Sequence, residues 1–166
     1  DSPAEVAEKL NALVITVPVG ANGVLFLPHL NGERAPFVAA NARGAFFGLS
    51  ARSTKAEMGR AVMEGSAMSL RHCFEAEQGG RPKGVVRLTG GGARNGLWCQ
   101  IIADIMGVSL DVSDASDHGL WGAACLGAQA TGAGEACALA KRDEQTTRYD
   151  PDPAAVTAYD TVYTDY

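Results

Sequence analysis

Residues 85–107 read VVRLTGGGARNGLWCQIIADIMG, and this stretch decides the fold class of the 166-residue chain. Residues 85–88 form a short apolar run that predicts a strand, and Thr89 with three glycines predicts a tight turn after it. Apolar residues at helical spacing then predict a helix, which Gly107 ends. Strand, glycine turn and helix in this order are typical of an α/β layered domain.

The segments after Gly107 continue the alternation. Apolar residues at 108, 110 and 112 predict a further strand, and residues 114–118 predict a polar loop. Residues 120–130 predict a helix rich in alanine and glycine. The tail, residues 149–166, carries four tyrosines spaced as in a surface helix that aromatic side chains hold in place.

The first half of the chain predicts two helices around a short strand. A capping box beginning at Ser2 opens a helix that ends near Leu13, and residues 24–27 predict a strand. A second capping box, residues 54–57, opens a helix that the glycine pair 79–80 ends. Small residues at 65–67 suit close packing against another element. The predicted packing face comprises Met58, Ala61, Val62, Gly65, Met68, Ser69 and Cys73. Between them, residues 29–48 predict a long irregular segment anchored by aromatic residues, and such segments are usually functional.

The composition predicts one domain with a true core, because 46% of the residues are hydrophobic. The net charge of −5, with no basic stripe, argues against nucleic acid as a partner, and the apolar runs are too short to cross a membrane. The four cysteines show no zinc-binding spacing. We expect Cys99 and Cys125 to be small core thiols, and reduced thiols favour a cytoplasmic location.

The glycine turn is the motif with the clearest chemistry. Glycine tolerates positive φ and lets the main chain approach a ligand, and the helix that follows directs free N–H groups at the turn. Candidate nucleotide-binding residues are therefore Gly90, Gly91 and Gly92, with Asn95 in the first helical turn. The alternative, a strand-to-helix turn that binds no ligand, stays open. No Gly-Lys-Ser/Thr follows, so the turn is not a P-loop, and it also lacks the G-x-G-x-x-G pattern.

Five segments in order resemble the FGGY carbohydrate kinases. GAFFGL at residues 44–49, followed after seven residues by EMGRAVME at 57–64, resembles the second pattern of that family. LPHLNGERAP at residues 27–36 is similar to LPxLxGERxP of xylulokinase-like members. GGGARNGLWCQIIAD at residues 90–104 resembles GGGAxSxxWxQxxAD, residues 122–124 match a late LGAA helix, and residues 149–152 resemble the family tail.

This resemblance implies an actin-like, ribonuclease H-like α/β ATPase fold with two lobes. Residues 1–166 would form the C-terminal, nucleotide-binding portion of the second lobe, and the N-terminal sugar-binding domain with the catalytic aspartate would be missing from this chain. The implied reaction is transfer of the γ-phosphate of ATP to a sugar hydroxyl, with ATP or ADP as cofactor. Of the family's nucleotide contacts, this chain retains the Gly-Gly-Gly-Ala turn, so the resemblance adds Ala93 to the candidate nucleotide-binding residues. Mg²⁺ would be held through the phosphates, with no metal site in this chain. The fragment alone would then be inactive.

The sequence does not decide the substrate. Xylulose is the expected ketopentose, while ribulose, erythritol and glycerol remain alternatives, as does a non-catalytic actin-like nucleotide-binding module. The oligomeric state is also open, and a homodimer is compatible with the sequence.

Several individual residues allow two interpretations of their role. Some family members place an asparagine four residues after the last glycine, where this chain has Gly96, and serine commonly stands at the position of Asn95. Glu33 and Arg34 either close the cleft between the lobes near the transferred phosphate or pair locally and stiffen their loop.

We expect Trp98 and Trp121 to be core residues rather than adenine-stacking residues. We expect Asp111, Asp114 and Asp117 to form a solvated acidic loop rather than a metal site.

Overall fold

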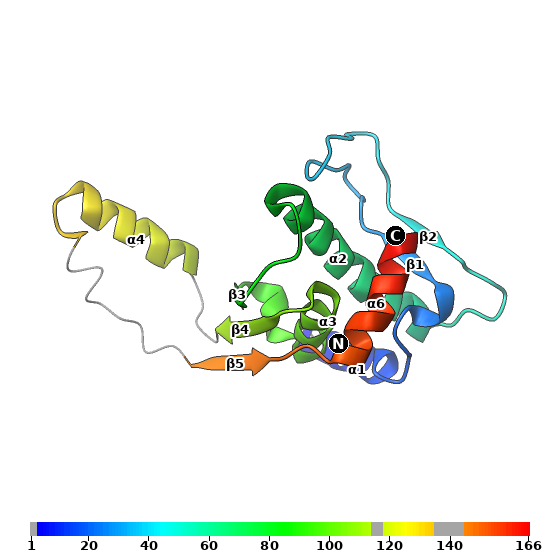
Figure 1. Ribbon diagram of the computed structural model, residues 1–166. Coiled ribbons are helices and arrows are strands. Elements are labelled where there is room, and N and C mark those ends of the chain that lie inside the picture. Colours follow the sequence, from blue (N-terminus) through cyan, green and yellow to red (C-terminus); the bar gives the residue numbers. More distant parts are fainter. Residues whose placement is uncertain (1–2, 114–117, 135–144) are drawn as a thin grey trace.

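The computed structural model describes residues 3–113, 118–134 and 145–166. Figure 1 shows their arrangement, with most helices gathered around α3. The predicted Ser2 cap and the loop residues 114–117 lie outside the described residues. The elements are α1 (Pro3–Val14), η1 (Ala21–Gly23), β1 (Leu25–Leu27), β2 (Ala45–Phe47), α2 (Lys55–Gln78), β3 (Val85–Leu88), η2 (Gly91–Arg94), α3 (Gly96–Met106), β4 (Ser109–Ser113), α4 (His118–Ala130), β5 (Thr146–Tyr149) and α6 (Pro153–Asp165).

The larger sheet confirms the predicted strand–helix–strand unit. β3 pairs in parallel with β4, with Leu88 opposite Val112, and α3 connects the two strands. β5 pairs antiparallel with β4 and was not predicted. Three of its four residues are exposed, so its sequence has no apolar alternation to indicate a strand.

The smaller sheet is a pair of three-residue strands, β1 and β2. The segment around β2 was predicted to be irregular, and that prediction was wrong for residues 45–47. Phe46 of β2 packs on Phe26 of β1 with ring centroids 4.7 Å apart. β1 lies directly on α2 at Gly65, where a β-carbon would overlap the carbonyl oxygen of Phe26, so the small residue predicted there is required by packing.

The predicted capping box of α2 is confirmed. The backbone N–H of Glu57 donates to Thr54 Oγ1 (3.3 Å), and the backbone N–H of Thr54 donates to Glu57 Oε2 (2.7 Å). Gly79, in the left-handed conformation, ends the helix as predicted. These bonds satisfy main-chain groups that the helix termini would otherwise leave without partners.

The buried face of α2 differs in part from the prediction. Ala61, Gly65 and Met68 are buried as predicted, but Val62 is 38% exposed. Charged residues take part in the buried face instead: Arg60, Glu64 and Arg71. Periodicity places residues on a face but does not reveal that a distant helix supplies partners for buried charges.

Helix α6 supplies those partners. Tyr159 is fully buried; its hydroxyl donates to Glu64 Oε1 (2.9 Å) and accepts from Arg60 Nη2 (2.6 Å). Arg60 Nε also donates to Glu64 Oε1 (2.6 Å), as does the backbone N–H of Gly20 (3.2 Å). Burial raises the pKa of Tyr159 far above its usual value, so this hydroxyl keeps its proton. The tail helix is therefore part of the core, beyond the surface packing that was predicted.

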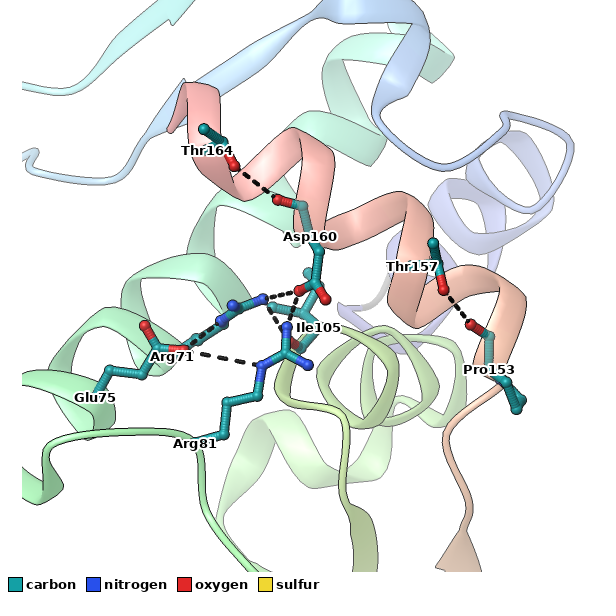
Figure 2. Close-up of polar contacts among 8 residues, drawn as sticks. All are labelled: Arg71, Glu75, Arg81, Ile105, Pro153, Thr157, Asp160 and Thr164. Carbon is teal, nitrogen blue, oxygen red and sulfur yellow. Dashed lines mark hydrogen bonds and ion pairs between the residues drawn. The ribbon is translucent and has the colours of Figure 1, made fainter.

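A second cluster joins α6 to the C-terminal half of α2, as Figure 2 shows. Arg71 donates to Glu75 (2.8 Å) and to Asp160 of α6 (2.8 Å), and Arg81 pairs with the same aspartate. The guanidinium of Arg71 also stacks on Tyr163, 3.9 Å from the ring centroid. These contacts balance the buried charge of Arg71 and fix the tail on α2.

Helix α4 lies away from the helices around α3 in Figure 1. Its Leu120 and Leu126 are each 70% exposed.

The two cysteines predicted to be core thiols differ. Cys99 is a buried free thiol as predicted, but Cys125 is disulfide-bonded, so the expectation of a core thiol at position 125 was wrong. The reduced-thiol argument for a cytoplasmic location is correspondingly weaker. Within the described ranges, no helix has the length and apolar character needed to cross a membrane.

Candidate functional site

The glycine turn follows the carboxyl end of β3 and leads into α3. Gly90 has φ of 100°, and Gly91–Arg94 form a single 3₁₀ turn. The backbone N–H of Ala93 donates to Gly90 O (3.1 Å), and that of Asn95 donates to Gly92 O (3.1 Å). The strand thus reaches α3 through this 3₁₀ turn rather than through a simple bend.

The fold constrains the three glycines differently. Gly90 adopts a positive φ that disfavours any residue with a side chain. At Gly92, a β-carbon would overlap the ring of Trp98, which lies against the turn. At Gly91, φ is not positive and a β-carbon would meet no atom within 4 Å. Neither conformation nor packing therefore requires glycine at position 91, and its bare main chain faces open space.

The turn presents donor groups at this open position. The N–H groups of Gly91 and Gly92 begin the 3₁₀ turn, so they precede its first internal hydrogen bond, and no carbonyl in the described part of the chain accepts from them. Both residues are exposed. Adjacent free N–H groups are suited to an anion or to the polar edge of a nucleotide.

Ala93 anchors the turn in the main core. It is only 9% exposed and belongs to the main core, and its carbonyl oxygen accepts a hydrogen bond from Cys99 Sγ (3.3 Å). The side chain of Ala93 is thus not available to a ligand. Its packing instead holds the main chain of Gly91 and Gly92 in place.

Asn95 is the N-cap of α3. Its Oδ1 accepts from the backbone N–H of Trp98 (3.2 Å). It also forms a reciprocal pair with Asn11 of α1: Asn11 Nδ2 donates to Asn95 Oδ1 (3.1 Å), and Asn95 Nδ2 donates to Asn11 Oδ1 (2.9 Å). The sequence analysis did not identify Asn11. A polar residue on the α1 face that carries Leu10 and Val14 was the one signal that could have found it.

Trp98 packs as predicted. Its ring is partly buried against the main core, and its Nε1 donates to the carbonyl oxygen of Met63 on α2 (3.2 Å). The indole thus forms the base of the glycine turn.

Glu33 organises its own loop. Its Oε1 accepts from the backbone N–H groups of Arg34 (2.8 Å) and Ala35 (3.3 Å), and its Oε2 is 2.7 Å from His29 Nδ1. The bonds from the main chain of Arg34 and Ala35, followed by His29, hold the pKa of Glu33 below its ordinary value. Glu33 therefore interacts within its own loop, but its partners are His29 and main-chain groups rather than the Arg34 side chain. The Arg34 side chain is exposed.

The two candidate regions contact α2 at different places. The glycine turn reaches Met63 through Trp98, whereas the Glu33 loop reaches Cys73, whose Sγ donates to Ala35 O (3.2 Å). Residues 63 and 73 of a helix that rises 1.5 Å per residue lie about 15 Å apart. The structure thus keeps Glu33 and Arg34 separate from the turn.

Gln100 and Asp104 of α3, which match the GGGAxSxxWxQxxAD pattern, attach the tail. Gln100 Nε2 donates to Asp104 Oδ1 (2.9 Å) and to the carbonyl oxygen of Asp150 (2.8 Å), and Asp104 Oδ1 accepts from the backbone N–H of Asp152 (2.9 Å). Burial raises the pKa of Asp104. Segments 90–104 and 149–152, singled out separately in the sequence, are thus in direct contact.

The described ranges contain no group of three or more His, Cys, Asp or Glu side chains that could hold a metal ion. Asp111 forms an ion pair with Arg148 (3.3 Å), while Asp114 and Asp117 lie outside the described residues. Trp121 is partly exposed on α4, rather than buried as predicted.

Comparison with known proteins gives a consistent result. Residues 2–131 match the FGGY family of carbohydrate kinases, C-terminal domain. The chain is 34% identical over 165 residues to a xylulose kinase of Haemophilus influenzae, covering 96% of this chain and 33% of that enzyme. It is 38% identical over 125 residues to a gluconokinase of Bacillus licheniformis, covering 74% and 24%.

A solved structure agrees with these relatives. The fold superposes on ligand-bound xylulose kinase from Lactobacillus acidophilus with a TM-score of 0.84 and 30% identity, covering 96% of this chain and 33% of that one. The predicted resemblance and the predicted α/β, actin-like fold class are confirmed. The chain spans a quarter to a third of the length of the relatives it matches.

Proposed function

This chain belongs to the FGGY family of carbohydrate kinases, and we propose that it is the nucleotide-binding portion of an enzyme that transfers the γ-phosphoryl group of ATP to a sugar hydroxyl. The observation that carries the proposal is the open main chain at Gly91, where the fold itself has no need of glycine. It lies inside the segment that resembles the family's GGGA motif.

The proposed role of the turn is positioning. Phosphoryl transfer depends mainly on alignment of the reactants and on neutralisation of charge. In this proposal the N–H groups of Gly91 and Gly92 bind the nucleotide, Ala93 and Trp98 support them from the core, and Mg²⁺ is bound through the phosphates, as this ion usually is.

The catalytic base and most sugar contacts are assigned to an N-terminal domain of the same enzyme, because the chain spans only a quarter to a third of its relatives. Residues 1–166 would then be its C-terminal domain. We expect this chain alone to bind ADP weakly and to transfer no phosphate. Phosphoryl transfer by residues 1–166 alone would contradict this division of roles.

Xylulose is the proposed acceptor, supported by relatives named xylulose kinase. Relatives named gluconokinase, at 38% identity, make gluconate the first competitor. A cytoplasmic location is part of the same proposal because the donor is ATP, and cell fractionation tests it.

Two measurements test the function. Titration calorimetry of this chain with ADP, alongside the Gly91→Ala variant, tests the nucleotide site; equal affinity of the two proteins would refute the assignment. An ADP-release assay then uses a polypeptide in which an FGGY N-terminal domain precedes these residues. Turnover should be fastest with xylulose among xylulose, ribulose, gluconate, erythritol and glycerol. ADP binding without turnover on any of these acceptors would favour a non-catalytic module instead.

A further inference from the structure

We propose that Asn11 of α1 is a positioning residue for the nucleotide-binding turn. By pairing with Asn95, it would hold the start of α3, and with it the 3₁₀ turn, in the form that exposes Gly91 and Gly92. The inference rests on the proposed function, because the turn matters for activity only if it binds nucleotide.

The amide pair has a fixed polarity. Asn95 Oδ1 already accepts from the backbone N–H of Trp98 (3.2 Å), so the oxygen of this side chain must face the start of α3. Its NH₂ group therefore faces the oxygen of Asn11 (2.9 Å), while the NH₂ group of Asn11 faces Asn95 Oδ1 (3.1 Å). Position 11 must thus supply one donor and one acceptor, which an amide does and a carboxylate does not.

Asn11 is held on a fixed surface. Its neighbours on α1, Leu10 and Val14, pack against α2 at Gly59, where a β-carbon would lie 2.8 Å from Leu10 Cδ1 and 3.1 Å from Val14 Cγ2. Val14 is completely buried in the main core. The amide of Asn11 therefore faces Asn95 from a helix that is itself packed firmly against α2.

The main chain of Asn95 connects the Asn11–Asn95 pair to the glycine turn. Its N–H closes the 3₁₀ turn on Gly92 O (3.1 Å), and its carbonyl oxygen accepts the first α3 hydrogen bond, from Cys99 N (3.0 Å). A displacement of Asn95 would loosen both bonds. The amide exchange rates of Ala93 and Asn95, whose N–H groups bond within the turn, therefore report its order directly.

The experiment uses three substitutions and one control in this chain. Asn11→Ala removes the pair, and Asn11→Asp keeps its shape while placing an oxygen opposite Asn95 Oδ1. Asn95→Ser keeps an N-cap but removes the pair, because serine caps helices as well as asparagine does. Glu8→Ala, at an exposed position one turn earlier on α1, is the control. Each protein is measured by ADP calorimetry, amide hydrogen exchange by NMR, and thermal unfolding.

We expect Asn11→Ala to weaken ADP binding about tenfold, because Asn95 loses both hydrogen bonds that hold it to α1. Exchange of the Ala93 and Asn95 amides should accelerate by a similar factor. Asn11→Asp should have the larger effect, and Asn11→Ala should change nothing further when Asn95 is already serine. The Glu8→Ala control should match the unchanged chain in all three measurements.

The inference is overturned if Asn11→Ala lowers the unfolding temperature but leaves both the exchange rates and ADP affinity unchanged, since Asn11 would then be structural only. It is also overturned if the effects of Asn11→Ala and Asn95→Ser add independently. Absence of ADP binding by the unchanged chain would refute the proposed function, and the exchange rates would still decide whether Asn11 positions the turn.

Discussion

Gly91→Ala adds one methyl group at the open position of the glycine turn. The structure offers no atom within 4 Å of that methyl, and φ at this residue is not positive. Alanine at such a position restricts the unfolded chain and typically raises the free energy of unfolding by about 0.4–1 kcal/mol. The fold should therefore tolerate or favour the substitution.

Gly92→Ala is the matched comparison, one residue along the same turn. Here the methyl overlaps the ring of Trp98, which is anchored by its hydrogen bond to the carbonyl oxygen of Met63. Moving an anchored, core-packed ring typically costs about 1–3 kcal/mol. The two variants thus have opposite expected effects on stability, although their chemistry is the same.

Urea unfolding and ADP calorimetry on both variants separate structure from binding. If the nucleotide contacts the main chain at Gly91, the added methyl should weaken ADP binding at least tenfold, or about 1.4 kcal/mol, without loss of stability. Gly92→Ala should lose both. The reasoning is refuted if Gly91→Ala binds ADP as well as the unchanged chain does, or if it is destabilised as much as Gly92→Ala.

Three further predictions concern stability. Thr54→Ala removes the side-chain cap of α2 and should lower the free energy of unfolding by about 1 kcal/mol, with Thr54→Ser close to unchanged in the same urea titration. Tyr159→Phe deletes a buried hydroxyl between Glu64 and Arg60 and should cost about 1.5–3 kcal/mol; a change within 0.5 kcal/mol, about the size of a surface substitution, would contradict the network. The pKa of Glu33 is lowered in the folded state, so its stabilising contribution is present above the ordinary value of 4.5 and is lost as pH falls through the folded value; unfolding measured against pH should lose this dependence in Glu33→Gln.

Elements set by local signals could be predicted from the sequence. The Thr54 capping box, the strand before the glycines and the helix ended by Gly107 all depend on residues a few positions apart, and all three are present. β2 and β5 were missed because short strands exist only through their pairing partners. The buried Arg60 and Glu64 were missed for a similar reason, because their partner Tyr159 is about a hundred residues away in sequence.

The strand–turn–helix geometry of the candidate site could be predicted in outline. The three glycines drew attention to the turn, but sequence alone treats them as equivalent. Their differences arise from a ring beneath Gly92 and from the backbone angle of Gly90. The role of Asn95 as a cap paired with Asn11 depends on how α1 packs, which no local pattern encodes.

The link between α6 and α2 bears on how this domain folds during synthesis. Arg60 and Glu64 leave the ribosome long before Tyr159 does, so until then the two charges lack the hydroxyl that joins them in the finished core. The nascent chain would keep this region hydrated until Tyr159 has left the ribosome and α6 can pack on α2. A stop codon upstream of Tyr159 should therefore yield a product that chaperones and proteases recognise as incomplete.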